Sequence, residues 1–250
     1  RDSDNQKCEI KITYKMESAS FVENKCKQKR VKTIFGDDWS NIIKKQIILI
    51  KEKFQKEPLF YLERDRKTKQ GSIKLGWRYE MEHNAKRPLG TPIEQKIAKY
   101  VWENNSGNKE YRNCPVNGVK IKNSGVPNFA FIKNAEKFNS IEDIFLDLIP
   151  IENIIKNGSI TTAFTAQNYN PIRDYQGGGT NRDLSVPIDW SIKNGEVTAK
   201  LIFDKPLEIN SNIQLEKLKT VLYELEIPVG KRFDISKFYK KLNPNVIVFQ

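Results

Sequence analysis

The stretch Ser72–Glu82 reads SIKLGWRYEME, and the rest of the fold is best predicted outward from it. Apolar side chains occupy every second position, and charged side chains occupy most of the positions between them. An alternation with a period of two is typical of a β-strand with one face on a core and the other in solvent. The stretch therefore predicts a strand that buries Trp77 and Tyr79 and exposes Arg78 and Glu80.

Two β-hairpins are predicted, and the first contains this strand. Residues 59–65 and 72–82 flank a short polar segment that ends in Gly71, so residues 59–82 are expected to form one hairpin. Residues 187–204 are expected to form the other. Their alternating stretches flank Asn194-Gly195, which is a strong signal for a type I′ turn.

Helices are predicted between the hairpins and after them. Apolar residues at helical spacing follow Asp37 and Asp38 and predict a helix over residues 39–54. Thr91-Pro92-Ile93-Glu94 is a capping box that predicts a helix from residue 92 to about residue 104. Strands and helices do not alternate regularly. The expected fold class is therefore α+β, with mixed or antiparallel sheets and several helices.

The charge of the chain is unevenly distributed. Its 43 Lys and Arg residues exceed its 31 Asp and Glu residues by 12, and residues 1–125 carry 28 of the basic and 16 of the acidic side chains. A drift in composition towards lysine would load both halves alike, so the asymmetry favours a polyanionic partner. We expect a basic, polyanion-binding α+β region over residues 1–125 and a charge-neutral α+β region over residues 126–250, or one continuous domain.

Three carboxylates of the first hairpin are the candidate catalytic and metal-binding residues. Glu80 and Glu82 lie two positions apart and so share a face of their strand, and Asp65 is expected across from them. Gathered carboxylates bind Mg²⁺, which can activate water for attack on a phosphate. The alternative is a solvated strand face that balances its own charge. The candidate nucleic-acid-binding residues around them are Lys67, Lys69, Lys74, Arg78, Lys86 and Arg87.

An acid on one strand followed by Glu-x-Glu on the next resembles a variant of the restriction-endonuclease core. The likeness covers the residues from Asp65 to Glu82, and Glu82 stands where that core usually has lysine. The resemblance implies Mg²⁺-dependent nuclease activity, and without that activity no cofactor is expected.

Other site chemistries lack the residues they need. The chain has one histidine, His83, and its cysteines, Cys8, Cys26 and Cys114, form no Cys-x-x-Cys pair, so a zinc framework would lack ligands. A Ser-His-Asp triad is not indicated, because no nucleophile elbow accompanies the one histidine. A group of aromatic side chains in the basic half either stacks on single-stranded bases or closes the rim of a core. This group comprises Tyr100, Trp102 and Tyr111.

The predicted function is binding of nucleic acid or another polyanion, with nuclease activity as a subordinate version. Two alternatives belong to other classes. The polar opening 1–7 and the absence of an initial methionine suggest an exported, lipoprotein-like bacterial domain that binds a protein, a glycan or an anionic surface. The other is a structural subunit of a larger assembly. No apolar run approaches the ~18 residues of a membrane span. A cytoplasmic location is expected, or export if a signal peptide precedes Arg1.

Overall fold

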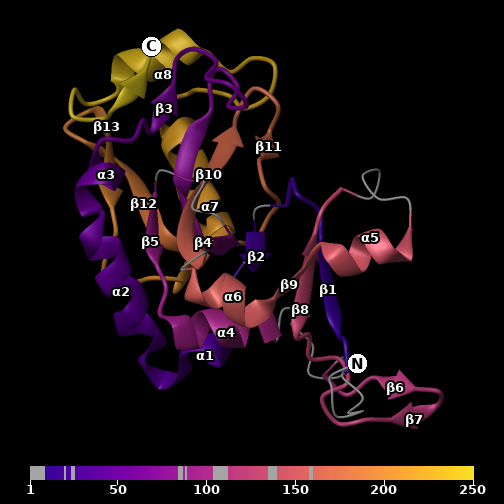
Figure 1. Ribbon diagram of the computed structural model, residues 1–250. Helices are drawn as coiled ribbons and strands as arrows, with labels where there is room; N and C mark the ends of the chain where they lie inside the picture. Colours follow the sequence, from indigo (N-terminus) through magenta and orange to yellow (C-terminus); the bar gives the residue numbers. More distant parts are fainter. Residues whose placement is uncertain are drawn as a thin grey trace, which may run out of the picture. The chain divides into compact units, whose positions relative to one another are not determined.

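The computed structural model covers the chain and describes two compact units, each assembled from separate stretches. Unit 1 comprises Arg1–Asn24, Met81–Pro88 and Pro92–Thr162, and unit 2 comprises Lys25–Glu80, Leu89–Thr91 and Ala163–Gln250. The described residues are 9–19, 21–23, 26–83, 87, 89–103, 112–134, 140–157 and 160–250. Helices combine with mixed and antiparallel sheets, which confirms the α+β class (Figure 1).

The sheet of unit 2 has the strand order β11-β10-β4-β12-β13. These strands are β4 (Ile73–His83), β10 (Ile160–Asn170), β11 (Tyr175–Gln176), β12 (Asp183–Lys193) and β13 (Glu196–Leu201). Three short strands extend the sheet: β3 (Phe60–Tyr61) beside β4, β14 (Ile209–Asn210) beside β12, and β15 (Val248–Phe249) beside β3.

Both predicted hairpins are present. In the first, β3 and β4 are antiparallel and Phe60 lies opposite Ile73. In the second, β12 and β13 pair from Ile188 opposite Leu201 to Lys193 opposite Glu196. Asn194 and Gly195 join these strands with φ values of 51° and 80°, the left-handed pair that a type I′ turn requires.

Helices of unit 2 cover its sheet (Figure 1). They are α1 (Gln28–Phe35), α2 (Trp39–Leu49), α3 (Lys51–Gln55), α7 (Ser211–Glu224) and α8 (Ile235–Lys241), with a 3₁₀ turn, η1 (Gly36–Asp38), before α2. The helix predicted over 39–54 is interrupted at Ile50, where α2 ends and α3 begins. Phe54 of α3 packs edge-on against Trp77 and Phe164, with ring centroids 5.0 and 5.3 Å away.

The face of β4 predicted to be solvated is buried, and that prediction is wrong. Glu80 is 2% exposed and Lys74 is 0% exposed. Residues on both faces of β4 are buried, so both faces of this strand are covered by other parts of the chain. An alternating sequence shows that the two faces of a strand differ, but it does not show that either face is exposed to solvent.

The main sheet of unit 1 is small, with the order β1-β8-β9. Strand β1 (Ile12–Lys15) is parallel to β8 (Phe129–Ile132), which is antiparallel to β9 (Leu148–Pro150). The hairpin β6 (Pro115–Val116)–β7 (Val119–Lys120) lies in the same unit, and β2 (Phe21–Glu23) pairs with the end of β4. Its helices are α4 (Gln95–Glu103), α5 (Ile141–Leu146) and α6 (Ile151–Lys156).

The helix predicted after Thr91 is confirmed as α4, but it begins later than expected. Residues Gly90–Pro92 form the short strand β5 beside β10, and the helix starts at Gln95. Pairing with a neighbouring strand outweighs a local capping signal here. By contrast, the capping box at Ser140 and Asp143 does open α5, with hydrogen bonds in both directions.

Candidate functional site

The structure does not bring Asp65 next to Glu80. Because Phe60 lies opposite Ile73, β3 and β4 diverge into a loop, and Asp65 pairs there with Thr68. Glu80 lies seven positions beyond Ile73, in the opposite direction along β4. With a rise of about 3.3 Å per residue, Glu80 is about 23 Å along the strand from Ile73.

Each of the two glutamates has an arginine partner of its own. Glu80 Oε1 lies 3.6 Å from Arg78 Nη2, and Glu82 Oε2 lies 3.6 Å from Arg87 Nε. The backbone N–H of Arg87 also donates to Glu82 Oε1 at 2.8 Å. Among the residues that the structure describes, His, Cys, Asp and Glu side chains form no group of three able to hold a metal ion. The Mg²⁺ site stays a prediction.

Some of the predicted nucleic-acid-binding residues are exposed, and others are buried or paired with a carboxylate. Lys67 and Lys69 are exposed. Lys74 is fully buried, and its Nζ lies 3.4 Å from Glu57 Oε2 and 4.5 Å from the centre of the Trp77 ring. Burial lowers the pKa of Lys74 to about 8, against the opposing effect of Glu57. Lys74 therefore cannot reach a phosphate at the surface.

Of the other predicted residues, Arg78 is largely buried, Arg87 is exposed but paired with a glutamate, and Lys86 lies outside the described residues. The Arg78 side chain is 12% exposed in its pair with Glu80, and its Nη1 donates to Gly178 O at 3.4 Å. Arg87 is paired with Glu82, and Lys86 lies outside the described residues. Arg78 is thus committed to the interior of unit 2.

The aromatic residues predicted in the basic half also differ in how deeply they are buried. Trp102 is 0% exposed, and it meets the His83 ring edge-on at 5.9 Å. It therefore belongs to a core and does not stack on bases. Tyr100 is half-buried, and Tyr111 lies outside the described residues.

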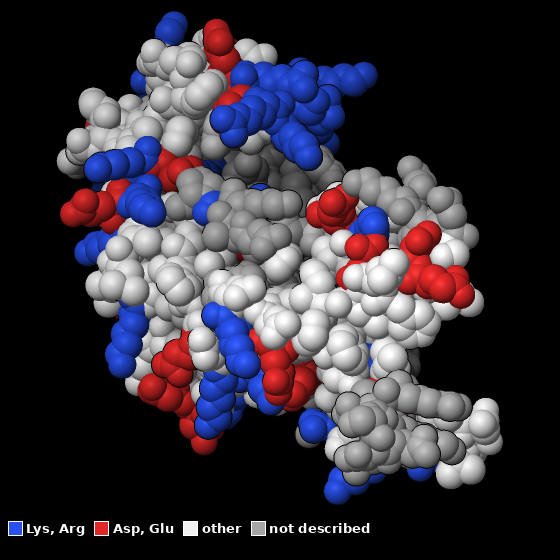
Figure 2. Space-filling model, in the orientation of Figure 1, with Lys and Arg blue, Asp and Glu red and all other residues white. Residues whose placement is uncertain are grey.

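A concentrated positive surface does lie on unit 2, and we call it the basic tip. It consists of exposed Lys and Arg side chains from three segments: the β3–β4 loop, the β10–β11 turn and the segment before α8. Figure 2 shows a dense group of Lys and Arg over the β3–β4 loop, whereas elsewhere on that face they lie among Asp and Glu. The residues of the basic tip are Arg64, Arg66, Lys67, Lys69, Arg173, Lys231 and Arg232.

Specific contacts hold the three segments of the basic tip together. Asn170 Nδ2 donates to Gln70 O at 2.9 Å, which ties the β10–β11 turn to the β3–β4 loop. The backbone N–H of Gly230 donates to Pro171 O at 2.7 Å, which ties the third segment to the same turn. A Cβ on Gly71 would lie 2.9 Å from Ile172 Cδ1, so the loop and the turn are in close contact. The basic tip is therefore organised by the fold.

Close to the seven cationic residues in sequence, the three segments contain four acidic residues, Glu63, Asp65, Asp174 and Asp234, and two of the four are engaged locally. Asp174 accepts a hydrogen bond of 2.6 Å from the Tyr169 hydroxyl, which lowers the pKa of Asp174, and Lys219 lies 3.4 Å from it. Asp234 caps α8 by accepting from the N–H of Lys237 at 2.8 Å. These carboxylates are partly neutralised where they lie, and the basic tip keeps an excess of positive charge.

The triple glycine 177–179 is anchored by hydrogen bonds to its backbone carbonyl groups. Gln167 Nε2 donates to Gly177 O at 2.6 Å and to Gly179 O at 2.9 Å, and Arg182 Nε donates to Gly178 O at 3.2 Å. Gly178 has a φ of +80°, and a Cβ on it would lie 2.7 Å from Arg78 Nη1. Glycine is required there because the backbone approaches the guanidinium so closely.

The division into two units separates charge almost as completely as the division into halves does. Unit 2 contains 28 basic and 17 acidic residues, a net charge of +11, and unit 1 contains 15 and 14, a net charge of +1. The basic half predicted from the sequence contributes residues to both units. The charge excess therefore belongs to the unit that carries the basic tip.

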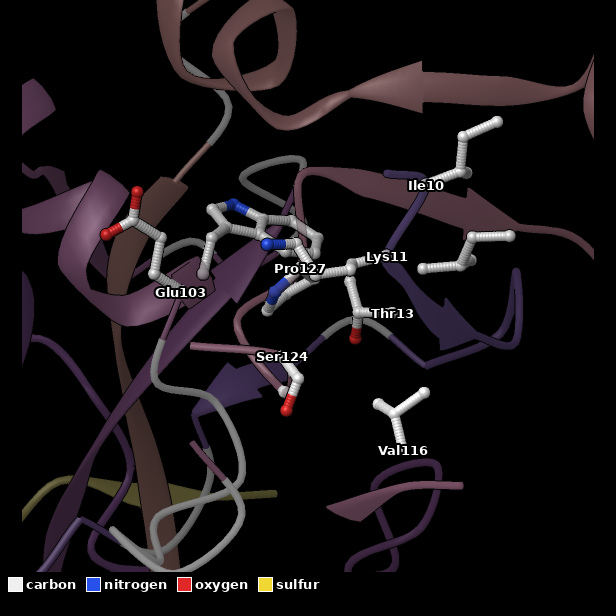
Figure 3. A pocket seen from close by; sticks show the side chains of 10 residues that line it. Ile10, Lys11, Thr13, Glu103, Val116, Ser124 and Pro127 are labelled. Atoms are coloured by element: carbon white, nitrogen blue, oxygen red, sulfur yellow. The ribbon is translucent and has the colours of Figure 1, made fainter. Parts of the chain in front are cut away.

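Unit 1 contains a hollow of about 410 Å³ beside β1 and α4. Lys11 and Thr13 contribute to its wall from the polar face of β1, Glu103 from α4, and Ser124 and Pro127 from the segment before β8. In Figure 3, Ile10 lies on the opposite side of the hollow from Glu103. Its volume suits a small molecule or a single side chain of a partner.

Of the seven residues of the basic tip, the sequence predicted two, Lys67 and Lys69, as nucleic-acid-binding residues. Arg64 and Arg66 had a local signal, because they share the stretch RDRKTK with Lys67 and Lys69. Arg173, Lys231 and Arg232 are distant in the chain and join the others only through the tertiary fold.

No family model, curated protein or solved structure matches the chain. Within the described part of the chain, no helix is both long enough and apolar enough to cross a membrane.

Proposed function

We propose that this chain binds nucleic acid through the basic tip of unit 2, mainly by contacts to phosphates. The observation that carries the proposal is the gathering of seven exposed cationic side chains from three distant segments. A clustered positive surface releases condensed counterions when it meets a chain of phosphates, and this release drives association.

The way in which the basic tip is held favours phosphate binding over a diffuse attraction. Its segments are joined by hydrogen bonds, so binding does not have to order them. Four of its seven cations are arginines, whose planar guanidinium can donate two parallel hydrogen bonds to one phosphate. We therefore expect tight but weakly sequence-selective binding.

An exposed tyrosine beside the basic tip supports a preference for single strands. Tyr175 is 60% exposed and lies two residues after Arg173. Unpaired bases stack on aromatic side chains, whereas the bases of a duplex stack on each other. We expect a single-stranded oligonucleotide to bind more tightly than the duplex of the same sequence.

The test is fluorescence anisotropy with a labelled single-stranded oligonucleotide, its duplex, and heparin as a competitor that lacks bases. Affinity should fall steeply as salt rises, because each phosphate contact contributes about one unit of slope. Binding that does not weaken with salt would overturn the proposal. Heparin that binds as tightly as the single strand would reassign the surface to polyanions in general.

A matched pair of variants separates the basic tip from net charge. Four substitutions to alanine in the basic tip, at Arg64, Arg66, Lys67 and Lys69, should lower affinity by about 100-fold. Four substitutions to alanine elsewhere on unit 2, at the exposed residues Lys29, Lys32, Lys45 and Lys56, remove the same charge and should lower it by less than about tenfold. Equal losses in the two variants would contradict the assignment to the basic tip.

A further inference from the structure

Strand β1 of unit 1 is an edge strand that pairs on one side only. Lys11 O accepts from the N–H groups of Asn128 and Phe129, and Lys15 O accepts from the N–H of Lys133. Successive residues of a strand direct their backbone groups to opposite sides, so Ile12 and Tyr14 direct theirs away from β8. No described strand pairs with that side of β1, which lies at the outer edge of its sheet (Figure 1).

Strand β1 and the residues on either side of it carry a row of exposed apolar side chains. Ile10, Ile12, Tyr14 and Met16 are 43–52% exposed and alternate with polar residues. Tyr14 stacks on Phe131 of β8 at 5.8 Å, so the row continues into the sheet. Soluble proteins usually protect an edge strand or pair it, because its free backbone groups and apolar side chains recruit another strand.

We infer that β1 is the binding site for a second copy of this chain, joined by antiparallel pairing of the two β1 edges. In the pairing register that the sequence supports, Ile12 of one copy lies opposite Ile12 of the other. This register places Glu9 opposite Lys15 of the partner and Ile10 opposite its Tyr14, and each pair occurs twice because of the two-fold axis.

Charge selects this register over the neighbouring ones. A shift by two residues in one direction places Lys11 opposite itself, and a shift in the other direction places Lys11 opposite Lys15. Like charges directly opposite each other destabilise a sheet, whereas opposite charges stabilise it. Odd shifts are excluded because they pair the outward groups of one copy with groups of the other that already bond to β8. The self-complementary pattern is why the occupant is another copy of this chain.

Hydrogen bonds to Asn128 hold the residues just before β1 in place. Asn128 Nδ2 donates to Glu9 O at 2.8 Å, and Lys11 N donates to Asn128 Oδ1 at 2.7 Å, which fixes the stretch before β1. The Glu9 side chain is 72% exposed, although its Oε2 lies 3.4 Å from Lys11 Nζ of the same chain. Lys15 is half-buried, with Nζ 5.8 Å from the Trp102 ring centre, so the contact with a partner's Glu9 would add to that contact. Ile12 lies on the two-fold axis, where the two copies exchange both backbone hydrogen bonds of a pair.

The first test is sedimentation equilibrium of the full chain across a hundredfold range of concentration. The native chain should be a dimer, and Ile12→Lys and Glu9→Lys should each weaken it by about tenfold or more, because each places lysines opposite each other or opposite Lys15. Ile149→Lys on β9 and Glu142→Lys on α5 are matched controls that should leave the dimer intact. A monomeric native chain, or equal effects of the variants and their controls, would overturn the inference.

The second test reads the register directly. Residues facing each other in a hydrogen-bonded pair have Cα atoms about 5.5 Å apart, a separation that a disulfide can bridge. Ile12→Cys should therefore form a covalent dimer on mild oxidation, well above the background set by the three native cysteines. Tyr14→Cys, which faces Ile10 of the partner, should stay at that background. Cross-linking of Tyr14→Cys but not Ile12→Cys would contradict this register. The inference is independent of nucleic-acid binding, because neither test involves the basic tip.

Discussion

The two units of this chain differ in the chemistry of their surfaces. Unit 2 carries a net charge of +11, whereas unit 1 has a net charge of +1. Of the 17 exposed large apolar residues among those that the structure describes, 11 belong to unit 1. A charged surface over a dense core suits a polyanionic partner, and a neutral surface with apolar side chains suits another protein. The contrast teaches that net charge and surface apolarity have to be assigned to folded units.

The difference in packing predicts the largest effect. Phe54 is fully buried and its ring meets those of Trp77, Phe164 and Phe203, so Phe54→Ala should lower the free energy of unfolding by about 3–5 kcal/mol. Tyr14→Ala in unit 1 removes a ring that is 50% exposed and should cost about 1 kcal/mol. Urea denaturation measures both, and similar costs would contradict the contrast between the units.

The next effect concerns the charge that unit 2 buries. Burial lowers the pKa of Lys74 from 10.5 to about 8, so between these values the unfolded chain binds a proton that the folded chain has released. Stability should therefore rise with pH above 8 in the native chain, by about 2 kcal/mol at pH 9.5, and not in Lys74→Met.

Denaturation at pH 7 to 9.5 tests this prediction. Tyr61, whose pKa burial raises to about 12, would reverse the trend above pH 10 because the unfolded tyrosine ionises first. Parallel curves for the native chain and Lys74→Met would show that Lys74 titrates normally.

A smaller effect compares equal charge reversals in the two units. Lys67→Glu in the basic tip should weaken oligonucleotide binding by about tenfold, because it replaces a phosphate contact with repulsion. Lys120→Glu on the exposed β7 of unit 1 makes the same change in net charge and should leave affinity within about twofold. Anisotropy titrations at one salt concentration measure both. An equal loss in both variants would mean that the whole chain attracts the nucleic acid.

The smallest effect concerns base stacking. Tyr175→Ala should reduce affinity for a single strand by about fivefold, at the lower end of what stacking contributes, and leave duplex affinity unchanged. Tyr223→Ala, which removes a side chain that is 84% exposed on α7, serves as the control. Loss of duplex binding in Tyr175→Ala would point to a structural role for this residue.

The sequence predicts local elements well and spatial neighbours poorly. The turn at Asn194-Gly195 and the strand β4 are both signalled by adjacent residues, and both elements are confirmed. The burial of Glu80 depends on the other parts of the chain that cover its face of β4, which local alternation does not identify. Helix α1 was missed because its Lys and Arg residues obscure the two that it buries, Val31 and Ile34.

The candidate site shows the same limit. Lys67 and Lys69 were found because they stand close together in the chain, and Lys74 was grouped with them for the same reason. Only the fold separates the exposed pair from the buried lysine. Proximity in sequence also suggested that Asp65 meets Glu80, but the register of β3 with β4 directs these two residues apart.

The interleaving of the two units has a consequence for how the chain is made. Unit 1 takes its last residues from around Thr162, while unit 2 needs segments from Lys25 onward and also Ala163–Gln250. During synthesis on the ribosome, the first strands of unit 2 emerge well before β12 and β13, which complete the same sheet. Half-made sheets expose apolar surface and unpaired edges. Nascent chains paused before residue 163 should therefore depend on chaperones more than the finished protein does.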